Sequence, residues 1–304
     1  MCEFVVDGLP KAAVGFDIPE KGYVVTEMSP GLFWVGDGVY CGMFVVHDSG
    51  VIAFDAPPAI GANYLAAIAE VTDKPITHLV YSHAHSDHIG AAHLFPKSIE
   101  IVAHAATTEY LQRKQDGRRP IPTLSIETAH HEMEIGGVTL HLDYHGINHD
   151  DGNLFMYLPG KRALMFVDVI YPGWIPFNRL GMAADVQGFM AAHDHALSYD
   201  FDHFVGGHVN RPGNREDLEI ARGYVHDLHA AARNAIANMG VPPTGARPGN
   251  LNIWQISNTL FDGIVDAMIV EVAPKWRGRL GGFDDCIREN AFRMMSAMMV
   301  ELPQ

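Results

Sequence analysis

The sequence predicts a layered α/β fold followed by an all-helical C-terminal third. Between residues 22 and 205, short apolar runs typical of buried strands alternate with stretches of helical periodicity, and Gly and Pro separate them. After Arg211-Pro212-Gly213 the apolar positions recur only with helical spacing. A chain of 304 residues with 48% hydrophobic residues can bury the core of one large domain or two modest ones. We therefore expect strands covered by helices, with further helices at the end.

The first group of elements lies between residues 22 and 114. Residues 22–56 are predicted to form one strand after another. Within this range 38–46 and 51–54 are apolar enough for buried strands, and a turn over 47–50 separates them. Pro57-Pro58 ends the second strand. The other elements expected here are a helix over 64–71, a strand over 76–81, a helical stretch over 89–94, a strand over 99–103 and a helix over 107–114.

The second group runs to residue 205, and Gly136-Gly137 and Pro159-Gly160 mark turns within it. A loop rich in Pro, Gly and aromatic residues separates most of its strands from its helix. The expected elements are strands over 138–144, 153–158 and 163–167, the loop 171–182, a helix over 186–197 and a short strand over 203–205.

The C-terminal helices have apolar faces that are too wide to stay in water. We expect a catalytic unit over residues 1–210 and a helical extension over 211–304. The extension is expected to pack on the α/β body, as a lid near loop 171–182 or as the interface of a homodimer. Its expected helices are 215–239, 251–272 and 284–301, with a linker over 241–250.

The net charge restricts the classes of partner. With 21 Lys and Arg against 36 Asp and Glu, the charge of −15 repels nucleic acids and anionic membranes, so we expect a small-molecule substrate. Cys2, Cys41 and Cys286 are too few and too far apart for a disulfide framework. Residues 1–11 lack the basic region of a signal peptide, and no apolar stretch reaches bilayer length. The cytoplasm is the expected compartment.

Histidine is the residue type that most needs an explanation. The chain has 18, and His83-Ala84-His85-Ser86-Asp87-His88 places four coordinating side chains directly after the expected strand 76–81. Imidazole nitrogen combined with carboxylate oxygen suits Zn²⁺, Fe²⁺ or Mn²⁺. Four ligands in so short a loop cannot reach one ion without strain, which favours two ions about 3.5–4 Å apart. An exposed histidine cluster is the alternative, and the ordered spacing behind an apolar strand disfavours it.

The H-x-H-x-D-H order resembles the signature of the metallo-β-lactamase superfamily. This resemblance implies an αββα sandwich with a dinuclear metal site between the two sheets. It also implies three further ligands, and the matching positions are His149, Asp168 and His208, each just beyond an apolar strand-like segment. In the implied site, one ion takes His83, His85 and His149, the other takes Asp87, His88 and His208, and Asp168 bridges them.

Hydrolysis is the activity that the resemblance implies. Two divalent ions would share a hydroxide that attacks an electrophile, while one ion polarises the electrophilic oxygen. Zn²⁺ is the expected metal, with Mn²⁺ and Fe²⁺ as alternatives. No G-x-S-x-G elbow provides a competing nucleophile. The sequence departs from the family at Asp150, where a small hydroxyl residue is common, and the motifs do not extend beyond residue 210.

The spacing of Asp168 and Tyr171 resembles that of the dinuclear N-acyl homoserine lactonases, in which this phenol hydrogen-bonds the substrate carbonyl. We therefore expect a lactone or a similarly activated ester as substrate, with Asp87 and Tyr171 as catalytic residues. An apolar wall with one polar group is typical of small-molecule sites, and packing under the C-terminal helices is the alternative. The expected substrate-binding residues are Tyr171, Trp174, Phe177 and Asn178.

Four further groups have weaker signals. Asp55 ends the strand 51–54 and is expected to accept an N–H from a ligand imidazole. His104 has either this role or that of a satisfied buried histidine. His193 and His195 are two residues apart on a helix and point to different faces, which favours solvent-exposed side chains. A solvated helix end is favoured over an anion clamp for the basic run of Arg113, Lys114, Arg118 and Arg119.

Other activities are compatible with the same ligands. A β-lactam, a thioester or a halogenated aromatic ring could be the electrophile. An iron-dependent oxidoreductase is disfavoured, because persulfide-type members need a smaller ligand set and flavodiiron members need a flavin domain. The charge of −15 opposes a nuclease, and the complete ligand set opposes a non-catalytic scaffold.

Overall fold

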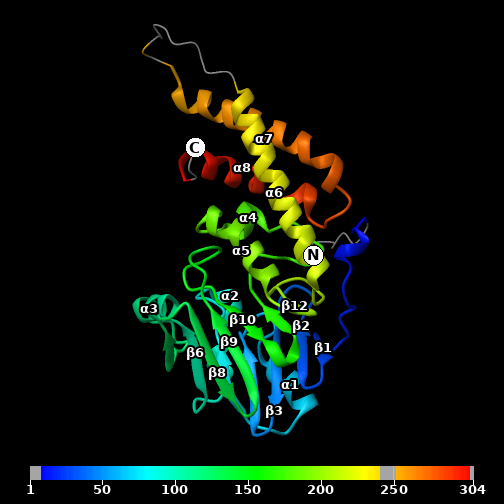
Figure 1. Ribbon diagram of the computed structural model, residues 1–304, viewed down its shortest axis with the longest axis vertical. Coiled ribbons are helices and arrows are strands. Elements are labelled where there is room, and N and C mark those ends of the chain that lie inside the picture. The colour runs from blue at the N-terminus through cyan, green and yellow to red at the C-terminus, as the bar shows by residue number, and fades with distance from the viewer. Residues whose placement is uncertain (1–7, 240–248, 250, 302–304) are drawn as a thin grey trace.

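The computed structural model describes residues 8–239, 249 and 251–301, and within them the chain forms an αββα sandwich with a helical arm (Figure 1). The predicted α/β layers and the added C-terminal helices are therefore confirmed. Most of the expected linker 241–250 and the first seven residues lie outside the described part. No helix within the described ranges is long and apolar enough to cross a membrane.

In the described part of the chain, the first sheet has seven strands that lie in sequence order. Neighbouring strands are antiparallel up to β4 and parallel from β4 to β7. Parallel neighbours need crossover connections, and these connections place helices on the outer face of the sheet. The strands are β1 (Val24–Ser29), β2 (Leu32–Gly36), β3 (Cys41–His47), β4 (Gly50–Phe54), β5 (Ile76–Val80), β6 (Glu100–His104) and β7 (Leu124–Ile126).

The second sheet has five described strands in the order β12-β11-β10-β9-β8. All neighbours are antiparallel except β11 and β12. Gly136 and Gly137 join β8 to β9 with φ of 55° and 82°, as a tight hairpin with two left-handed residues requires. The strands are β8 (His130–Ile135), β9 (Val138–Asp143), β10 (Phe155–Leu158), β11 (Ala163–Met165) and β12 (His203–Val205).

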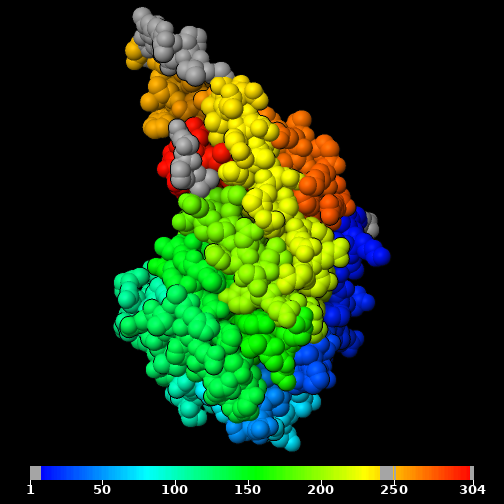
Figure 2. Space-filling model, viewed as in Figure 1, coloured from blue at the N-terminus to red at the C-terminus, as the bar shows by residue number. Residues whose placement is uncertain are grey.

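Helices cover both outer faces and form the arm. α6, α7 and α8 pack on one another, α6 also packs on α5, and α8 packs on α4. Figure 2 shows α6 and α7 continuing beyond the sandwich as a narrower projection. The helices are α1 (Ala62–Val71), α2 (Ser86–Ile89), α3 (Ala105–Lys114), α4 (Asn178–Met182), α5 (Val186–Ser198), α6 (Arg215–Asn238), α7 (Ile253–Trp276) and α8 (Phe283–Val300), with short 3₁₀ turns η1 (Lys11–Ala13), η2 (Ala92–Leu94) and η3 (Pro159–Lys161).

The described core residues form three clusters that correspond to the layers. Met43 and Val45 of β3 face the second sheet, whereas Phe44 between them faces α1, because successive side chains of a strand point to opposite faces. The third cluster begins on the outer face of the second sheet and continues through α5 into all three arm helices. Leu164 of β11 and Met294 of α8 belong to this one cluster. The arm is thus packed on the sandwich through a shared hydrophobic core.

The segment α4 is a short left-handed turn. Arg179, Leu180 and Gly181 have φ of 60°, 58° and 62° with ψ of 40°, 50° and 30°, and Met182 follows with φ of 57°. The left-handed conformation costs about 1–2 kcal/mol for each residue that carries a Cβ. Such a turn persists only where surrounding contacts hold it.

Three local predictions differ from the structure. The expected helical stretch over 89–94 is instead α2 followed by η2, and the strands β7 and β8 were not predicted. The prediction that His193 is solvent-exposed is wrong. His193 is only 1% exposed, because it lies on the face of α5 that packs against the core. The half-buried ring of His195 stacks on His145 with centroids 4.3 Å apart. Residues at i and i+2 do point to different faces, and one of those faces is the core.

Burial of His193 predicts a pH-dependent stability. Desolvation lowers the pKa of His193 to about 4, although its Nδ1 lies 2.9 Å from the carbonyl oxygen of Phe189. As the pH falls below about 6.5, His193 becomes protonated in the unfolded chain but stays neutral in the folded chain. The folded state therefore loses stability between about pH 6.5 and pH 4. We expect a loss of about 2–3 kcal/mol in the free energy of unfolding from this group.

Urea unfolding of the protein and of His193→Leu at several pH values between 7 and 4.5 measures this loss. The variant should lose less stability on acidification than the unaltered protein. His93→Leu, at an exposed position, serves as the control and should leave the pH dependence unchanged. Equal pH slopes in the protein and in His193→Leu would contradict the prediction.

Candidate metal centre

The loop that carries four of the predicted ligands is fixed at the end of a buried strand. It follows β5, and the backbone N–H of Ser82 donates to Oδ1 of Asp55 at 2.7 Å. Asp55 is itself the residue after β4 and is fully buried. The backbone N–H of Ala56 donates to the carbonyl of His88 at 2.7 Å. Two neighbouring parallel strands therefore hold both ends of the ligand loop at the same edge of the sheet.

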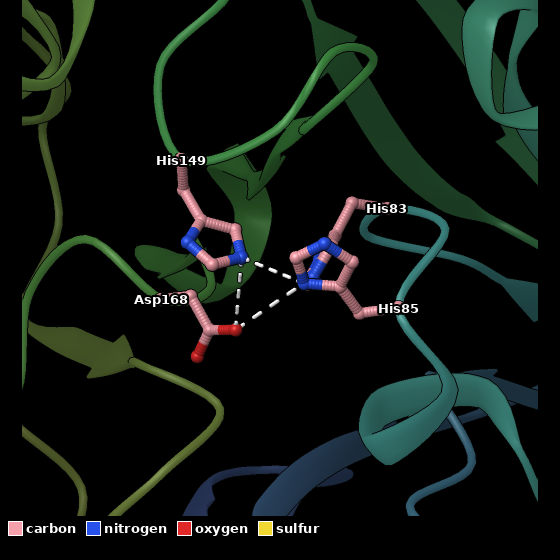
Figure 3. Close-up of side chains that lie close together, drawn as sticks. All are labelled: His83, His85, His149 and Asp168. Atoms are coloured by element: carbon pink, nitrogen blue, oxygen red, sulfur yellow. Dashed lines mark hydrogen bonds and ion pairs between the residues drawn. The ribbon is translucent and has the colours of Figure 1, made fainter. Parts of the chain in front are cut away.

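One group of ligands combines three histidines with Asp168, and their side chains point toward one another in Figure 3. Nε2 of His149 lies 2.9 Å from Nδ1 of His85 and 3.2 Å from Oδ2 of Asp168. Nε2 of His83 lies 3.6 Å from the same carboxylate oxygen. This Nε2 is buried and has no hydrogen-bond partner among the described residues. A buried imidazole nitrogen that points toward the other candidate ligands and has no hydrogen-bond partner has its lone pair available to bind a metal ion.

The second group shares the carboxylate of Asp168 with the first. Nε2 of His208 lies 3.0 Å from Oδ1 of Asp168, and Nε2 of His88 lies 2.9 Å from Oδ2. The two imidazole nitrogens are 3.2 Å apart. Oδ2 of Asp87 lies 3.5 Å from Nε2 of His88. The structure therefore brings together all seven predicted ligands, with Asp168 shared by the two groups.

Burial and charge set the protonation of these groups. Burial lowers the pKa of His83 well below its usual value, and the neighbouring His149 and His85 lower it further. Burial alone would raise the pKa of Asp168, but His88, His149 and His208 hold it well below the usual value. A buried anion among imidazoles is a site for cationic charge. Burial lowers the pKa of His88, but Asp168 outweighs this effect and raises it to about 9. Imidazoles that give up such protons to a bound metal would form, with the ionised carboxylate, a donor set that fits divalent cations.

The centre opens to solvent on one side. The Asp87 side chain is 42% exposed and that of His85 34%, whereas His83 and His88 are fully buried. Asp150, at the position where the sequence departs from the family, has Oδ1 4.0 Å from Nε2 of His85. A substrate would therefore approach past Asp87 and His85.

Tyr171 lies beside the ligands. Its ring centroid is 5.7 Å from that of His208, and its hydroxyl donates to the backbone carbonyl of Asp168 at 3.2 Å. Burial raises the pKa of Tyr171 well above 10, and the charge of Asp168 raises it further. The phenol is therefore protonated and able to donate a hydrogen bond at neutral pH.

The other predicted substrate-binding residues lie farther along the same loop. Nε1 of Trp174 donates to the carbonyl of Ala13 at 3.2 Å, and its ring packs so close to Gly281 that a methyl group there would lie 2.6 Å away. Phe177 is 54% exposed, and Asn178 is half-buried at the start of α4. Trp174 thus joins the N-terminal segment to the arm, and a substrate role for these three residues stays a prediction.

The weaker candidates have structural contacts. The predicted hydrogen bond from a ligand imidazole to Asp55 is not made among the described residues, because Oδ1 accepts the backbone N–H of Ser82 and Oδ2 has no partner. Asp55 therefore supports the ligand loop through its backbone, and burial raises the pKa of Asp55 to about 6. Nδ1 of His104 caps α3 at the N–H of Ala106. Arg119 donates to the carbonyl of Ala84 at 2.7 Å and pairs with Asp116 at 2.9 Å. This arginine of the basic run therefore braces the ligand loop.

Several supporting residues have no signal in the sequence. Ser82 Oγ lies 2.9 Å from Nδ1 of His83, and the Gly181 carbonyl lies 2.6 Å from Nδ1 of His149. Tyr40 packs on the His208 ring with centroids 4.5 Å apart, and its hydroxyl lies 3.4 Å from Oδ2 of Asp87. These contacts orient ligands from elements that are distant in sequence, which spacing along the chain does not reveal.

The chain is similar to proteins of known family. The 2,4-dinitroanisole O-demethylase subunit alpha of Nocardioides sp. (strain JS1661) is 30% identical over 229 residues, which are 66% of this chain and 65% of that protein. This match spans less than two thirds of the relative's length. Among solved structures, the metallo-beta-lactamase from Pontibacter korlensis has a TM-score of 0.59 at 19% identity and covers 67% of this chain and 99% of its own.

The match to a second solved structure covers more of this chain than the sandwich alone. The stereoselective inverting sec-alkylsulfatase Pisa1 from Pseudomonas sp. has a TM-score of 0.62 at 18% identity and covers 92% of this chain and 50% of its own. These two structures support the fold alone. The family model of the metallo-beta-lactamase superfamily matches residues 35–239, a range that contains all seven predicted ligands. With two thirds of its length matched by this model and with its ligands converging on Asp168, the chain belongs to the metallo-β-lactamase superfamily.

Proposed function

We propose that the protein is a dinuclear metal-dependent hydrolase that opens a lactone or a similarly activated ester. The observation that carries the proposal is the convergence of six side chains, in two groups of three, on the shared carboxylate of Asp168. His83, His85 and His149 would hold one ion, and Asp87, His88 and His208 the other. We propose Zn²⁺ as the metal, with Mn²⁺ and Fe²⁺ as alternatives, because the donor set mixes nitrogen and oxygen.

Two divalent ions, when bound, lower the pKa of water enough to give a nucleophile at neutral pH, and they polarise the electrophilic oxygen. The chain supplies the rest of the chemistry. Asp87 is the most exposed ligand, so its carboxylate is placed to accept a proton at the open side of the centre. His83 and His88, which are closed off from solvent, keep the inner side of the site dry.

Tyr171 is the proposed hydrogen-bond donor for the substrate. Its hydroxyl bonds the Asp168 carbonyl at 3.2 Å, so it is already held within reach of the ligands. The O–H can turn toward a carbonyl oxygen that develops negative charge without movement of the buried ring. A preorganised donor of this kind stabilises the transition state more than the substrate.

An activated aryl ether is a second candidate substrate. The relative that is 30% identical is named for removing the methyl group of 2,4-dinitroanisole, an electron-poor aromatic ether. A lactone and such an ether share an electron-poor carbon and an oxygen leaving group. In the ether reaction the nucleophile would attack the ring carbon, the bond from that carbon to the methoxy oxygen would break, and the methoxy group would take a proton and leave as methanol. The proposed nucleophile would therefore serve both reactions, whereas a carbonyl oxygen for Tyr171 to bond is present only in the lactone.

Homodimerisation through the arm is a further proposal. Ile253, Trp254 and Ile256 at the start of α7 are 60%, 75% and 44% exposed. Large apolar side chains gathered at the end of a helix favour contact with another protein surface.

Substitution of Asp168 should lower both the metal content and the activity of the protein. The purified protein is expected to hold close to two divalent ions per chain by elemental analysis. Asp168→Ala should release metal and lower activity on the order of 100-fold or more, because both ligand groups lose their shared carboxylate. Asp194→Ala, in an exposed pair with Arg222, is the control and should change neither quantity. Full activity in Asp168→Ala, or one tightly held iron in the unaltered protein, would refute the dinuclear hydrolase.

Tyr171→Phe should slow lactone opening with metal content unchanged. The expected loss in kcat/KM corresponds to about 1–3 kcal/mol of transition-state stabilisation, mainly in kcat. Tyr157→Phe removes a similar phenol-to-carbonyl hydrogen bond, to Asp200, at a remote site and is the matched control. If Tyr171→Phe retains the full rate, this tyrosine has a packing role only.

A substrate panel separates the candidates. Lactones, nitro-substituted aryl methyl ethers, β-lactams, thioesters and chloroaromatics should be assayed on protein loaded with zinc or manganese. Turnover of lactones above the other classes is the expected result. Turnover of the aryl ethers alone would establish the second candidate instead, and inactivity on every class would count against hydrolysis of activated C–O bonds.

A further inference from the structure

The left-handed turn in α4 is held by the C-terminal helix α8. Asn290 of α8 is fully buried, and its Oδ1 accepts the backbone N–H of Leu180 at 2.7 Å. Its Nδ2 donates to the carbonyl of Pro176 at 2.8 Å. One side chain therefore satisfies a backbone donor within the turn and a backbone acceptor just before it.

A second side chain of α8 holds the other end of the turn. Arg293, one helical turn after Asn290, donates to the carbonyl of Ala183 at 3.0 Å. The side chain of Leu180 is fully buried in the core that the arm shares with the sandwich. Residues in the left-handed region relax when such contacts are removed, because the conformation is unfavourable by itself.

The turn contacts a metal ligand directly. The carbonyl oxygen of Gly181 accepts the Nδ1–H of His149 at 2.6 Å, which leaves Nε2 of this ring free to face His85 and Asp168. A hydrogen bond of this kind fixes both the tautomer and the orientation of a ligand imidazole. Only glycine fits at position 181, because a methyl group there would lie 2.7 Å from the Asp168 carbonyl and 2.8 Å from the Tyr171 hydroxyl.

We propose that Asn290 is a positioning residue for the metal site formed by His83, His85 and His149. Its amide holds the left-handed turn, the turn places the Gly181 carbonyl, and that carbonyl orients His149. This inference rests on the proposed function only in assuming that the centre binds metal ions. It gives the C-terminal helix a part in the metal centre that is neither a lid nor an interface.

The proposal predicts an asymmetric effect on the two ions. His149 belongs to one ligand group only, and the turn makes no hydrogen bond to Asp87, His88 or His208 in the described structure. Loss of Asn290 should therefore weaken binding of one ion and spare the other. A general loss of folding would affect both.

The test is a stepwise Zn²⁺ titration of metal-free protein against a chromogenic chelator, which needs no substrate. Asn290→Leu keeps the size of the side chain and removes both hydrogen bonds. It should bind one of the two ions about 10–100-fold more weakly and the other as before. Absorption spectra of the Co²⁺-loaded protein should change for that one site only.

Two further variants keep the test decisive. Met268→Ala removes a fully buried side chain of α7 from the same shared core and should lower the Tm without separating the two affinities. Arg293→Gln removes the hydrogen bond from Arg293 to the Ala183 carbonyl, at a partly exposed position. It should produce a smaller loss of Zn²⁺ affinity at the same site. This variant carries the test if Asn290→Leu does not fold.

The outcomes distinguish this inference from the proposed function. Unaltered affinities in Asn290→Leu and Arg293→Gln, or equal losses at both sites that Met268→Ala reproduces, would overturn the positioning role. Failure of the unaltered protein to bind two Zn²⁺ ions would instead overturn the dinuclear centre itself.

Discussion

The carboxylate of Asp168 is the group on which the rest of the centre depends. It is buried among His83, His88, His149 and His208, and it has a left-handed backbone with φ of 65°. An ionised carboxylate in this position is stable only when cationic charge compensates its desolvation. The imidazoles, the strand ends that carry them and the braces around the ligand loop are arranged around this one requirement.

The ligand set could be predicted from the sequence through its resemblance to the metallo-β-lactamase superfamily, which implies His149, Asp168 and His208. His83, His85, Asp87 and His88 are also neighbours in one short loop. The residues that orient them could not be predicted. Gly181 acts through a backbone carbonyl, and Tyr40 and Asn290 act across long separations in the chain. Such contacts depend on tertiary packing, and no local pattern records them.

The fold shows the same division. The spacing of apolar residues predicts the buried strands and the long helices. This spacing reflects which faces of each strand or helix are buried in the core. It missed β8, whose His130–Ile135 sequence alternates polar residues on an edge strand, and it missed the left-handed form of α4. His193 was misplaced because helical spacing predicts divergent faces without predicting which one is buried. Local sequence patterns predict where helices and strands form. Which face of an element is buried depends on the elements that pack against it in the folded protein.

The hydrophobic core that runs from β11 into α8 has a consequence for how this chain can vary. A module joined by a linker can be exchanged, lost or transplanted, whereas one that completes the outer layer of a sandwich cannot. Removing it would uncover the faces of α4 and α5 on which α8 and α6 pack, and would open the core that they share. The helices and the sandwich of this chain should therefore vary together, and swapping the arm would require matched changes on α4 and α5.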